Sequence, residues 1–219
     1  MKKQYAVIGL GRFGSSIAQE LIKLGYDVLG IDKSEHSVEA MNQVLTRAVI
    51  ADATDEETLK SLGIRNFDCV IVAIGDDIQS SILTSLLLKE LEVKIVVAKA
   101  LSDLHGKVLK KLGVDRVVYP ERDMGVRVAH QLISPNLLDY IEISKDYTIA
   151  ELSVPKSMSG LSLKDLDIRV KYGCSVIAIN KTNSVTVAPM GTDILNENDI
   201  IVIIGTNQQI EEFEHKFVD

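Results

Sequence analysis

Six short apolar runs alternate with stretches of helical spacing in the first half of the chain, and this alternation is the strongest constraint on its fold. A strand that is apolar throughout is buried on both faces, as in a parallel sheet that is covered by helices. Six β-α units in this order predict a doubly wound α/β fold with a parallel sheet. The runs cover residues 5–9, 28–31, 48–50, 70–74, 95–97 and 117–119.

The first run leads into a glycine motif. Gly9, Gly11 and Gly14 form G-x-G-x-x-G between a predicted strand and a predicted helix, the context in which this motif indicates a Rossmann dinucleotide-binding loop. The first glycine permits a tight turn, the second lets the backbone approach a phosphate, and the third lets helix and strand pack closely. Amide N–H groups at the helix start then face the anion. We therefore predict that a nucleotide binds at this loop.

Two charged residues narrow the choice of ligand. Asp32, at the end of the second run, can accept hydrogen bonds from ribose hydroxyls and would repel a 2′-phosphate, which favours NAD-like or adenosine ligands over NADP. Asp32 can also cap the next helix, and the two roles are compatible. Arg12 lies inside the loop, where a guanidinium would favour a ligand with extra terminal phosphate charge, such as ATP or ADP. The alternative for Arg12 is a solvated side chain at a helix start.

Further candidate residues follow the later runs, at the carboxyl ends of strands, where ligands of open α/β sheets bind. Asp52 can accept a hydrogen bond from an adenine amino group, or it can form a turn or cap a helix. The segment 73–76 would line the same crevice, and the alternative for its aspartate is again a turn or a helix cap. Lys99 ends the fifth run, and Glu121 follows Pro120 after the sixth. Glu121 either complements a helix dipole or helps to hold a cation against phosphates, and spacing alone does not choose between these roles.

The pattern changes in the second half of the chain. A pre-proline break at Ser134 interrupts the helical spacing, and short strand-like runs separated by turns follow it. This pattern predicts a small α+β domain of about 80 residues, and we place the boundary at Ser134, which gives domains 1–134 and 135–219. The expected strands are 140–143, 149–154, 176–179, 185–187 and 200–204, before a final helix at 208–217.

Composition excludes several classes of protein. The formal net charge is −7, and without a basic stripe we expect no nucleic-acid partner. The apolar runs are too short for a signal peptide or a membrane span, so we expect a cytosolic chain. Cys69 and Cys174 are far apart, and the four histidines are scattered. We therefore expect the cysteines to be buried apolar side chains in a reducing compartment, and no metal cluster of nitrogen or sulfur ligands.

The sequence also lacks the usual catalytic motifs. A dehydrogenase needs a general acid or base near the nicotinamide, and the small second domain carries only His215. Neither the G-x-S-x-G elbow nor the P-loop lysine signature is present. We therefore expect a binding protein rather than an enzyme, with a small NAD-dependent oxidoreductase as the alternative.

A helix expected at residues 77–91 carries more apolar side chains than one core-facing stripe requires. A second apolar face indicates a subunit interface, and deep burial of the whole helix is the alternative. The apolar positions are Ile78, Ile82, Leu83, Leu86, Leu87, Leu88 and Leu91.

With these residues identified, the chain resembles the RCK/KTN family, which regulates potassium channels and transporters, and within it the cytosolic regulatory subunits of bacterial Ktr-type potassium uptake systems. The resemblance covers essentially the whole chain and is more specific than the glycine motif alone. It rests on the segments 6–14 (AVIGLGRFG), 63–67 (GIRNF), 72–75 (VAIG), 120–125 (PERDMG) and 169–174 (RVKYGC).

The resemblance implies that pairs of N-terminal domains assemble into an octameric ring beneath an integral-membrane subunit that conducts potassium. It also implies that ATP and ADP compete for the glycine-loop site, with which NAD(H) is also associated. The counterpart of Arg12 would reach the terminal phosphate of a nucleotide in the neighbouring subunit, and Glu121 would help to bind an activating cation, Mg²⁺ or Na⁺. The candidate nucleotide site comprises Gly9, Gly11, Arg12, Phe13, Gly14, Asp32, Lys33, Asp52, Ala53, Thr54, Ala73, Ile74, Gly75, Lys99 and Glu121.

For the second domain, the resemblance implies dimerisation and binding of cyclic di-AMP, which inhibits uptake. Arg169 would pair with a phosphate of this ligand, while Ile168, Val176 and Pro189 would face adenine. Plain core packing is the alternative for these three apolar residues. Some relatives carry Asn where this chain has Asp52, which leaves the adenine contact open.

Overall fold

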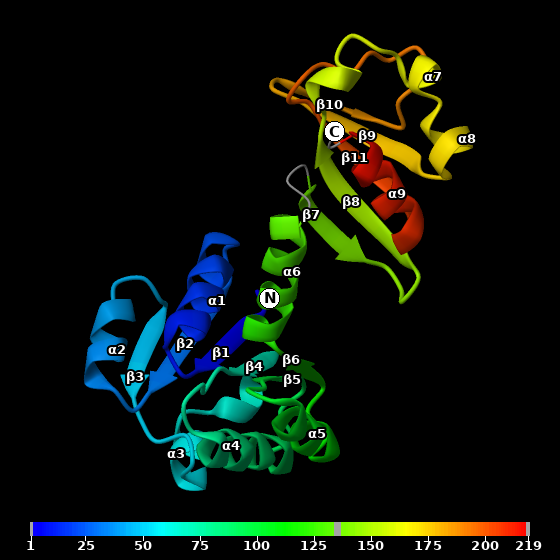
Figure 1. Cartoon of the computed structure of the whole chain (residues 1–219). Helices are drawn as coiled ribbons and strands as arrows, with labels where there is room; N and C mark the ends of the chain where they lie inside the picture. The colour runs from blue at the N-terminus through cyan, green and yellow to red at the C-terminus, as the bar shows by residue number, and fades with distance from the viewer. Residues whose placement is uncertain (1, 134–136, 218–219) are drawn as a thin grey trace. The chain divides into compact units, whose positions relative to one another are not determined.

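A computed structural model describes residues 2–133 and 137–217 of the chain (Figure 1). Its contacts divide the chain into two compact units, Met1–Arg122 and Asp123–Asp219. The expected domain boundary at Ser134 lies outside the described residues, so it stays a prediction.

The first unit is the predicted doubly wound domain. Its six strands are all parallel and follow the order β3-β2-β1-β4-β5-β6. From β1 the chain first adds strands on one side of the sheet, β2 and β3, and then on the other side, β4 to β6. The strands are β1 Gln4–Ile8, β2 Asp27–Asp32, β3 Arg47–Ile50, β4 Cys69–Val72, β5 Val96–Lys99 and β6 Arg116–Val118. The helices are α1 Arg12–Lys23, α2 Glu35–Met41, α3 Glu56–Ser61, α4 Ile78–Glu90 and α5 Asp103–Lys111, with a 3-10 turn η1 at Ile64–Asn66. Helix α6, Pro120–Ile133, begins in this unit and continues in the second.

Both faces of this sheet are buried, as the apolar runs predict. Along β1, Ala6 and Ile8 belong to one apolar cluster, while Val7 belongs to a second. Successive side chains of a strand point to opposite faces of the sheet, so the two clusters are the two cores between sheet and helices. This arrangement fixes the carboxyl ends of β1, β2, β4 and β5 along one edge.

The buried face of α5 differs from the one that sequence spacing predicts. Leu101, Leu104, Val108 and Leu112 have the spacing of one helix face, but Leu101 and Leu104 are exposed, and His105 and Leu109 are buried instead. The cause is the start of the helix: the Ser102 side chain accepts a hydrogen bond from the His105 amide and caps α5, so Leu101 lies before the helix.

Burial of His105 predicts a pH-dependent stability. Desolvation lowers the pKa of this imidazole below its ordinary value of 6.5, so below that pH the unfolded chain binds a proton that the folded chain does not. We expect the free energy of unfolding to fall between about pH 7.5 and about pH 5.5 in denaturant titrations. His105→Asn, which keeps an acceptor for the Leu101 amide that bonds Nδ1, should lose less stability on acidification, whereas the exposed control His36→Asn should behave like the parent chain. Identical pH profiles for all three proteins would contradict the assignment.

The second unit is the predicted α+β domain. Its antiparallel sheet follows the order β10-β9-β11-β8-β7, and α9 packs against β8 and β11. Phe213 of α9 and Ile201 and Ile203 of β11 belong to its buried core. The elements are β7 Leu137–Glu142, β8 Tyr147–Ser153, a 3-10 turn η2 at Lys156–Met158, α7 Leu163–Leu166, α8 Ile168–Tyr172, β9 Ser175–Lys181, β10 Ser184–Val187, β11 Ile200–Thr206 and α9 Asn207–Phe217.

Candidate functional site

The glycine loop joins β1 to α1 in the geometry that phosphate binding requires. Gly9 has φ +93°, in the region that favours glycine, and Gly11 is the extended N-cap of α1. A Cβ at Gly14 would lie 1.8 Å from the Gly9 carbonyl oxygen, whereas a Cβ at Gly11 would meet no atom within 4 Å. The first amides of a helix have no acceptor within it. The space beside Gly11 is open, so an anion can approach the start of this helix.

Asp32 connects the end of β2 to this loop. Its Oδ2 accepts a hydrogen bond from the Leu10 amide at 2.6 Å, and its Oδ1 accepts one from the Ser34 amide at 2.8 Å. Ser34, not Asp32, is the N-cap of α2, so the interpretation of Asp32 as the helix cap is wrong. Each carboxylate oxygen has two lone pairs, so Asp32 can hold the loop and still accept a ribose hydroxyl.

Asp52 forms a turn, which is one of the two roles expected for it. Its Oδ1 accepts hydrogen bonds from the Thr54 amide at 2.8 Å and the Thr54 hydroxyl at 2.6 Å, and Lys33 Nζ lies 3.2 Å away. The Thr54 hydroxyl is the largest cause that lowers the pKa of Asp52. Ala53 is buried, and its carbonyl accepts from the Thr84 hydroxyl. The contact of Asp52 with adenine stays a prediction.

The segment after β4 lies against the loop. The Ala73 amide donates to the Ile8 carbonyl at 2.7 Å, and the Ala73 side chain is 3.1 Å from the Cβ position of Gly14. Ile74 packs against the core, and the Cβ position of Gly75 lies 3.1 Å from Lys99 Nζ. The residues 73–75 therefore lie next to both the glycine loop and the Lys99 side chain.

Lys99 and Glu121 form an ion pair beside the loop. Lys99 Nζ lies 2.5 Å from Glu121 Oε1, and the Lys99 side chain is 8% exposed while that of Glu121 is 68% exposed. Lys99 Nζ also lies 5.8 Å from the ring centroid of Phe13. The Lys99 hydrogen bond, with a smaller contribution from the charge of Arg12, lowers the pKa of Glu121. The loop is thus bordered by positive charge from Lys99 and Arg12.

A cation would need ligands beyond this ion pair. Among residues 2–133 and 137–217, no group of three or more His, Cys, Asp or Glu side chains could hold a metal ion. The Glu121 carboxylate already accepts from Lys99. It can contribute one ligand, and phosphate oxygens or another chain would have to supply the rest.

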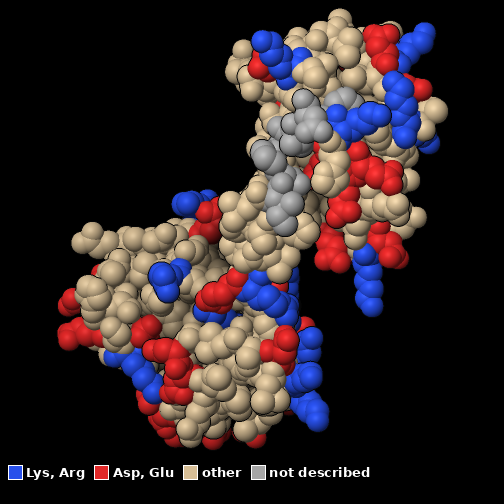
Figure 2. Space-filling model, viewed as in Figure 1, with Lys and Arg blue, Asp and Glu red and all other residues tan. Residues whose placement is uncertain are grey.

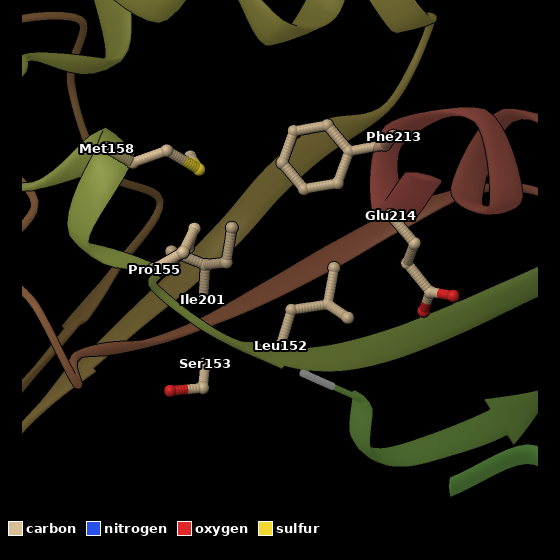
Figure 3. A pocket seen from close by; sticks show the side chains of 7 residues that line it. All are labelled: Leu152, Ser153, Pro155, Met158, Ile201, Phe213 and Glu214. Atoms are coloured by element: carbon tan, nitrogen blue, oxygen red, sulfur yellow. The ribbon is translucent and has the colours of Figure 1, made fainter. Parts of the chain in front are cut away.

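The candidate residues of the second unit differ in their burial. Ile168 is buried in the core, Val176 packs against that core, and Arg169 is exposed on α8. Pro189 is half-buried beyond β10. A separate pocket, between α9, β8 and β11 (Figure 3), is lined by Leu152, Ser153, Pro155, Met158, Ile201, Phe213 and Glu214. None of those seven side chains is cationic, so this pocket is poorly suited to a phosphate ligand.

Helix α4 buries three hydroxyl side chains together with Leu87 and Leu88. Ser81, Thr84 and Ser85 are buried, whereas Ile78 is 42% and Leu83 38% exposed. Figure 2 shows uncharged atoms over much of α4, with acidic and basic side chains around them. In the described part of the chain, no helix has the length and apolar character needed to cross a membrane.

Comparisons with known proteins agree with this architecture. Residues 5–120 match the TrkA-N domain family and residues 147–218 the TrkA-C domain family. The chain is 48% identical to Ktr system potassium uptake protein C of Bacillus subtilis (strain 168), over 99% of this chain and 98% of the relative. It is also 48% identical to Ktr system potassium uptake protein A of the same organism, over 98% and 96%. The GsuK channel has the same fold at a TM-score of 0.74 and 20% identity, with 99% of this chain covering 40% of that one.

Proposed function

The chain belongs to the RCK/KTN family of Ktr potassium uptake regulators, and we propose that it is a cytosolic subunit that senses adenine nucleotides and gates a membrane potassium transporter. As a member of this family it is a regulatory protein and not an enzyme. The observation that carries the proposal is the glycine loop, which has open space beside Gly11 at the start of α1 and positive charge nearby from Arg12 and the buried Lys99.

The proposed signal is the difference between ATP and ADP. A ligand shifts a conformational equilibrium only through unequal affinity for the two states. We assign that inequality to the terminal phosphate of ATP and to Arg12, which would reach the nucleotide of a neighbouring subunit. Glu121 would add an oxygen ligand for Mg²⁺ or Na⁺ at the phosphates. NAD(H) is the second candidate ligand of the same loop.

Titration calorimetry on the purified full-length chain tests this proposal with ATP, ADP, NAD⁺ and NADH. We expect saturable binding of both ATP and ADP. The alternative, a small NAD-dependent oxidoreductase, requires loss of NADH fluorescence with a carbonyl substrate. Absence of binding for every adenine compound would overturn the proposal, and NADH turnover would favour the alternative.

The proposed partners are further copies of the chain, arranged as dimers in an octameric ring, and the membrane subunit beneath which the ring docks. The exposed apolar residues of α4 support the first of these. Leu83→Asp is expected to lower the mass of the assembly in light scattering, because an apolar side chain at an interface is replaced by a charge. Asn42→Asp, at an exposed position at the end of α2, is the control and should leave the mass unchanged. An unaltered mass for Leu83→Asp would place the interface elsewhere.

Cyclic di-AMP is the proposed inhibitory ligand of the second unit. The exposed guanidinium of Arg169 is its proposed phosphate contact. The core position of Ile168 supports packing rather than ligand contact for that residue. The same calorimetry with cyclic di-AMP tests this ligand independently of ATP and ADP.

A further inference from the structure

Ala188 has a backbone conformation that its residue type does not explain. In the described part of the chain, the non-glycine residues with a positive φ are Glu92, Asp167, Ala188 and Asn198. Glu92 follows α4 and Asp167 ends α7, where a left-handed residue is common, and asparagine adopts this region more readily than most side chains. Ala188, with φ +52°, instead ends a strand and precedes Pro189, and a residue before proline is driven toward extended conformations. Its conformation is therefore imposed by the surrounding structure.

The structure that holds Ala188 includes a bulge in β9. Strand β9 lies between β10 and β11 (Figure 1). The register shifts between Val202 and Ile203 of β11, so Ile177 is the extra residue of a bulge in β9. The Ile177 carbonyl accepts a hydrogen bond from the Ala188 amide at 2.9 Å. A bulge redirects its own strand, and here it also fixes the amide of the strained residue.

The neighbours of this hydrogen bond along the chain are two candidate ligand residues. Val176 precedes Ile177, and Pro189 follows Ala188. Both would face the adenine of cyclic di-AMP. Val176 packs against the core, and Pro189 is half-buried. Because the ring of a proline fixes its own φ, the backbone of Ala188 largely determines where the Pro189 ring points.

The segment that follows this corner is fastened to α7. The Leu163 amide donates to the Asp193 carbonyl at 3.0 Å. The Lys164 amide donates to the Gly191 carbonyl at 2.8 Å. The first amides of a helix have no acceptor within it, so at the start of α7 they are free to hold this segment. Helix α7 leads into α8, which carries Arg169, so the corner and the proposed phosphate contact belong to one hydrogen-bonded framework.

We propose that Ala188 is a positioning residue for cyclic di-AMP, whose strained backbone holds Pro189 in the orientation that an adenine ring requires before the ligand binds. Strained backbone persists only where the structure over-determines it, and it is concentrated at ligand sites. A segment that is ordered in advance spares the ligand the cost of ordering it. This inference rests on the binding of cyclic di-AMP proposed above, and it assigns to Ala188 a role that acts through Pro189.

Substitutions that differ in their tolerance of a positive φ test the proposal, by calorimetry with cyclic di-AMP on the full-length chain. The Ala188 side chain is exposed, so its replacement changes the backbone preference without disturbing the core. Ala188→Gly adopts a positive φ readily and should bind within about twofold of the parent chain. Ala188→Val, with a β-branched side chain that is an outlier at positive φ, should bind about tenfold more weakly or worse.

Ala188→Asn separates the effect of the backbone from that of side-chain bulk. The asparagine side chain is similar in size to that of valine but tolerates the left-handed region, so its binding should stay close to that of the parent chain. Equal losses in Ala188→Asn and Ala188→Val would assign the effect to bulk and overturn the proposal. The affinities are compared at a temperature at which circular dichroism shows every variant folded. A purely structural role of Ala188 would lower the melting temperature and leave the affinity unchanged.

Hydrogen exchange of the parent chain tests the ordering of this corner without any variant. The Ala188 amide donates to the Ile177 carbonyl, so without ligand it should exchange as slowly as the paired amides of β10. Fast exchange that slows only when cyclic di-AMP is added would contradict the proposal. This measurement decides the test if Ala188→Val does not fold.

The outcomes separate this inference from the proposed ligand. Equal affinity of the parent chain and Ala188→Val for cyclic di-AMP overturns the role of Ala188 and leaves the ligand intact. Absence of binding to the parent chain overturns both.

Discussion

Gly14→Ala is expected to abolish nucleotide binding and to lower the melting temperature by about 10 °C or more. The added Cβ would lie 1.8 Å from the carbonyl oxygen of Gly9, so either α1 or the loop must move. Such a clash with backbone costs about 3 kcal/mol or more, which for a domain of this size corresponds to the stated shift. Thermal unfolding by circular dichroism and titration with ADP measure the two effects.

Gly11→Ala is the matched control, because a Cβ there meets nothing within 4 Å and the backbone is extended. We expect its stability to change by only about 1 kcal/mol. Its nucleotide affinity should fall by about tenfold or more, since the methyl group stands where the phosphate approaches. A folded Gly11→Ala that binds ADP normally would refute phosphate binding at this loop.

The second large effect is expected from Arg12→Ala. Charge-assisted hydrogen bonds contribute about 1.5–3 kcal/mol, so loss of the guanidinium should weaken ATP binding by about 10-fold to 100-fold. ADP, which lacks the terminal phosphate, should be affected by about twofold at most. The ratio of the two affinities is therefore the quantity to measure, by calorimetry on parent and variant.

Arg65→Ala is a suitable comparison, because Arg65 is an exposed arginine of the same unit that pairs with Glu92. It should leave both affinities unchanged. Equal losses of ATP and ADP binding in Arg12→Ala would remove the proposed origin of nucleotide discrimination.

The layout of the first unit could be predicted from sequence because local and global signals agree there. Uniformly apolar runs appear as β1 to β6, and the glycine loop occupies the turn that its pattern indicates. The runs at 176–179 and 200–204 of the second unit likewise lie in β9 and β11. These features are determined by residues that are close together in the sequence, and hydrophobic periodicity reports on such short windows of sequence.

Other features depend on the tertiary structure. The ion pair of Lys99 with Glu121 forms because β5 and β6 are adjacent, and no spacing rule indicates it. The inward face of α4 carries hydroxyl groups because Ser85 donates to the Ser81 carbonyl and Thr84 to the Ala53 carbonyl. A hydropathy scale that treats serine as a surface residue would assign this buried face of α4 to solvent. The one-residue shift on α5 similarly follows from the cap at Ser102.

The double attachment of Asp32 has a consequence for any attempt to redesign the ligand preference of this protein. Replacing an acid at the end of β2 with a small or basic residue is the usual way to admit a 2′-phosphate. In this chain the same carboxylate anchors the Leu10 amide, so that exchange would also release the loop that we propose as the phosphate site. A variant that accepts NADP would therefore need a compensating acceptor for the Leu10 amide, and adenine-nucleotide selectivity and loop rigidity would have to change together.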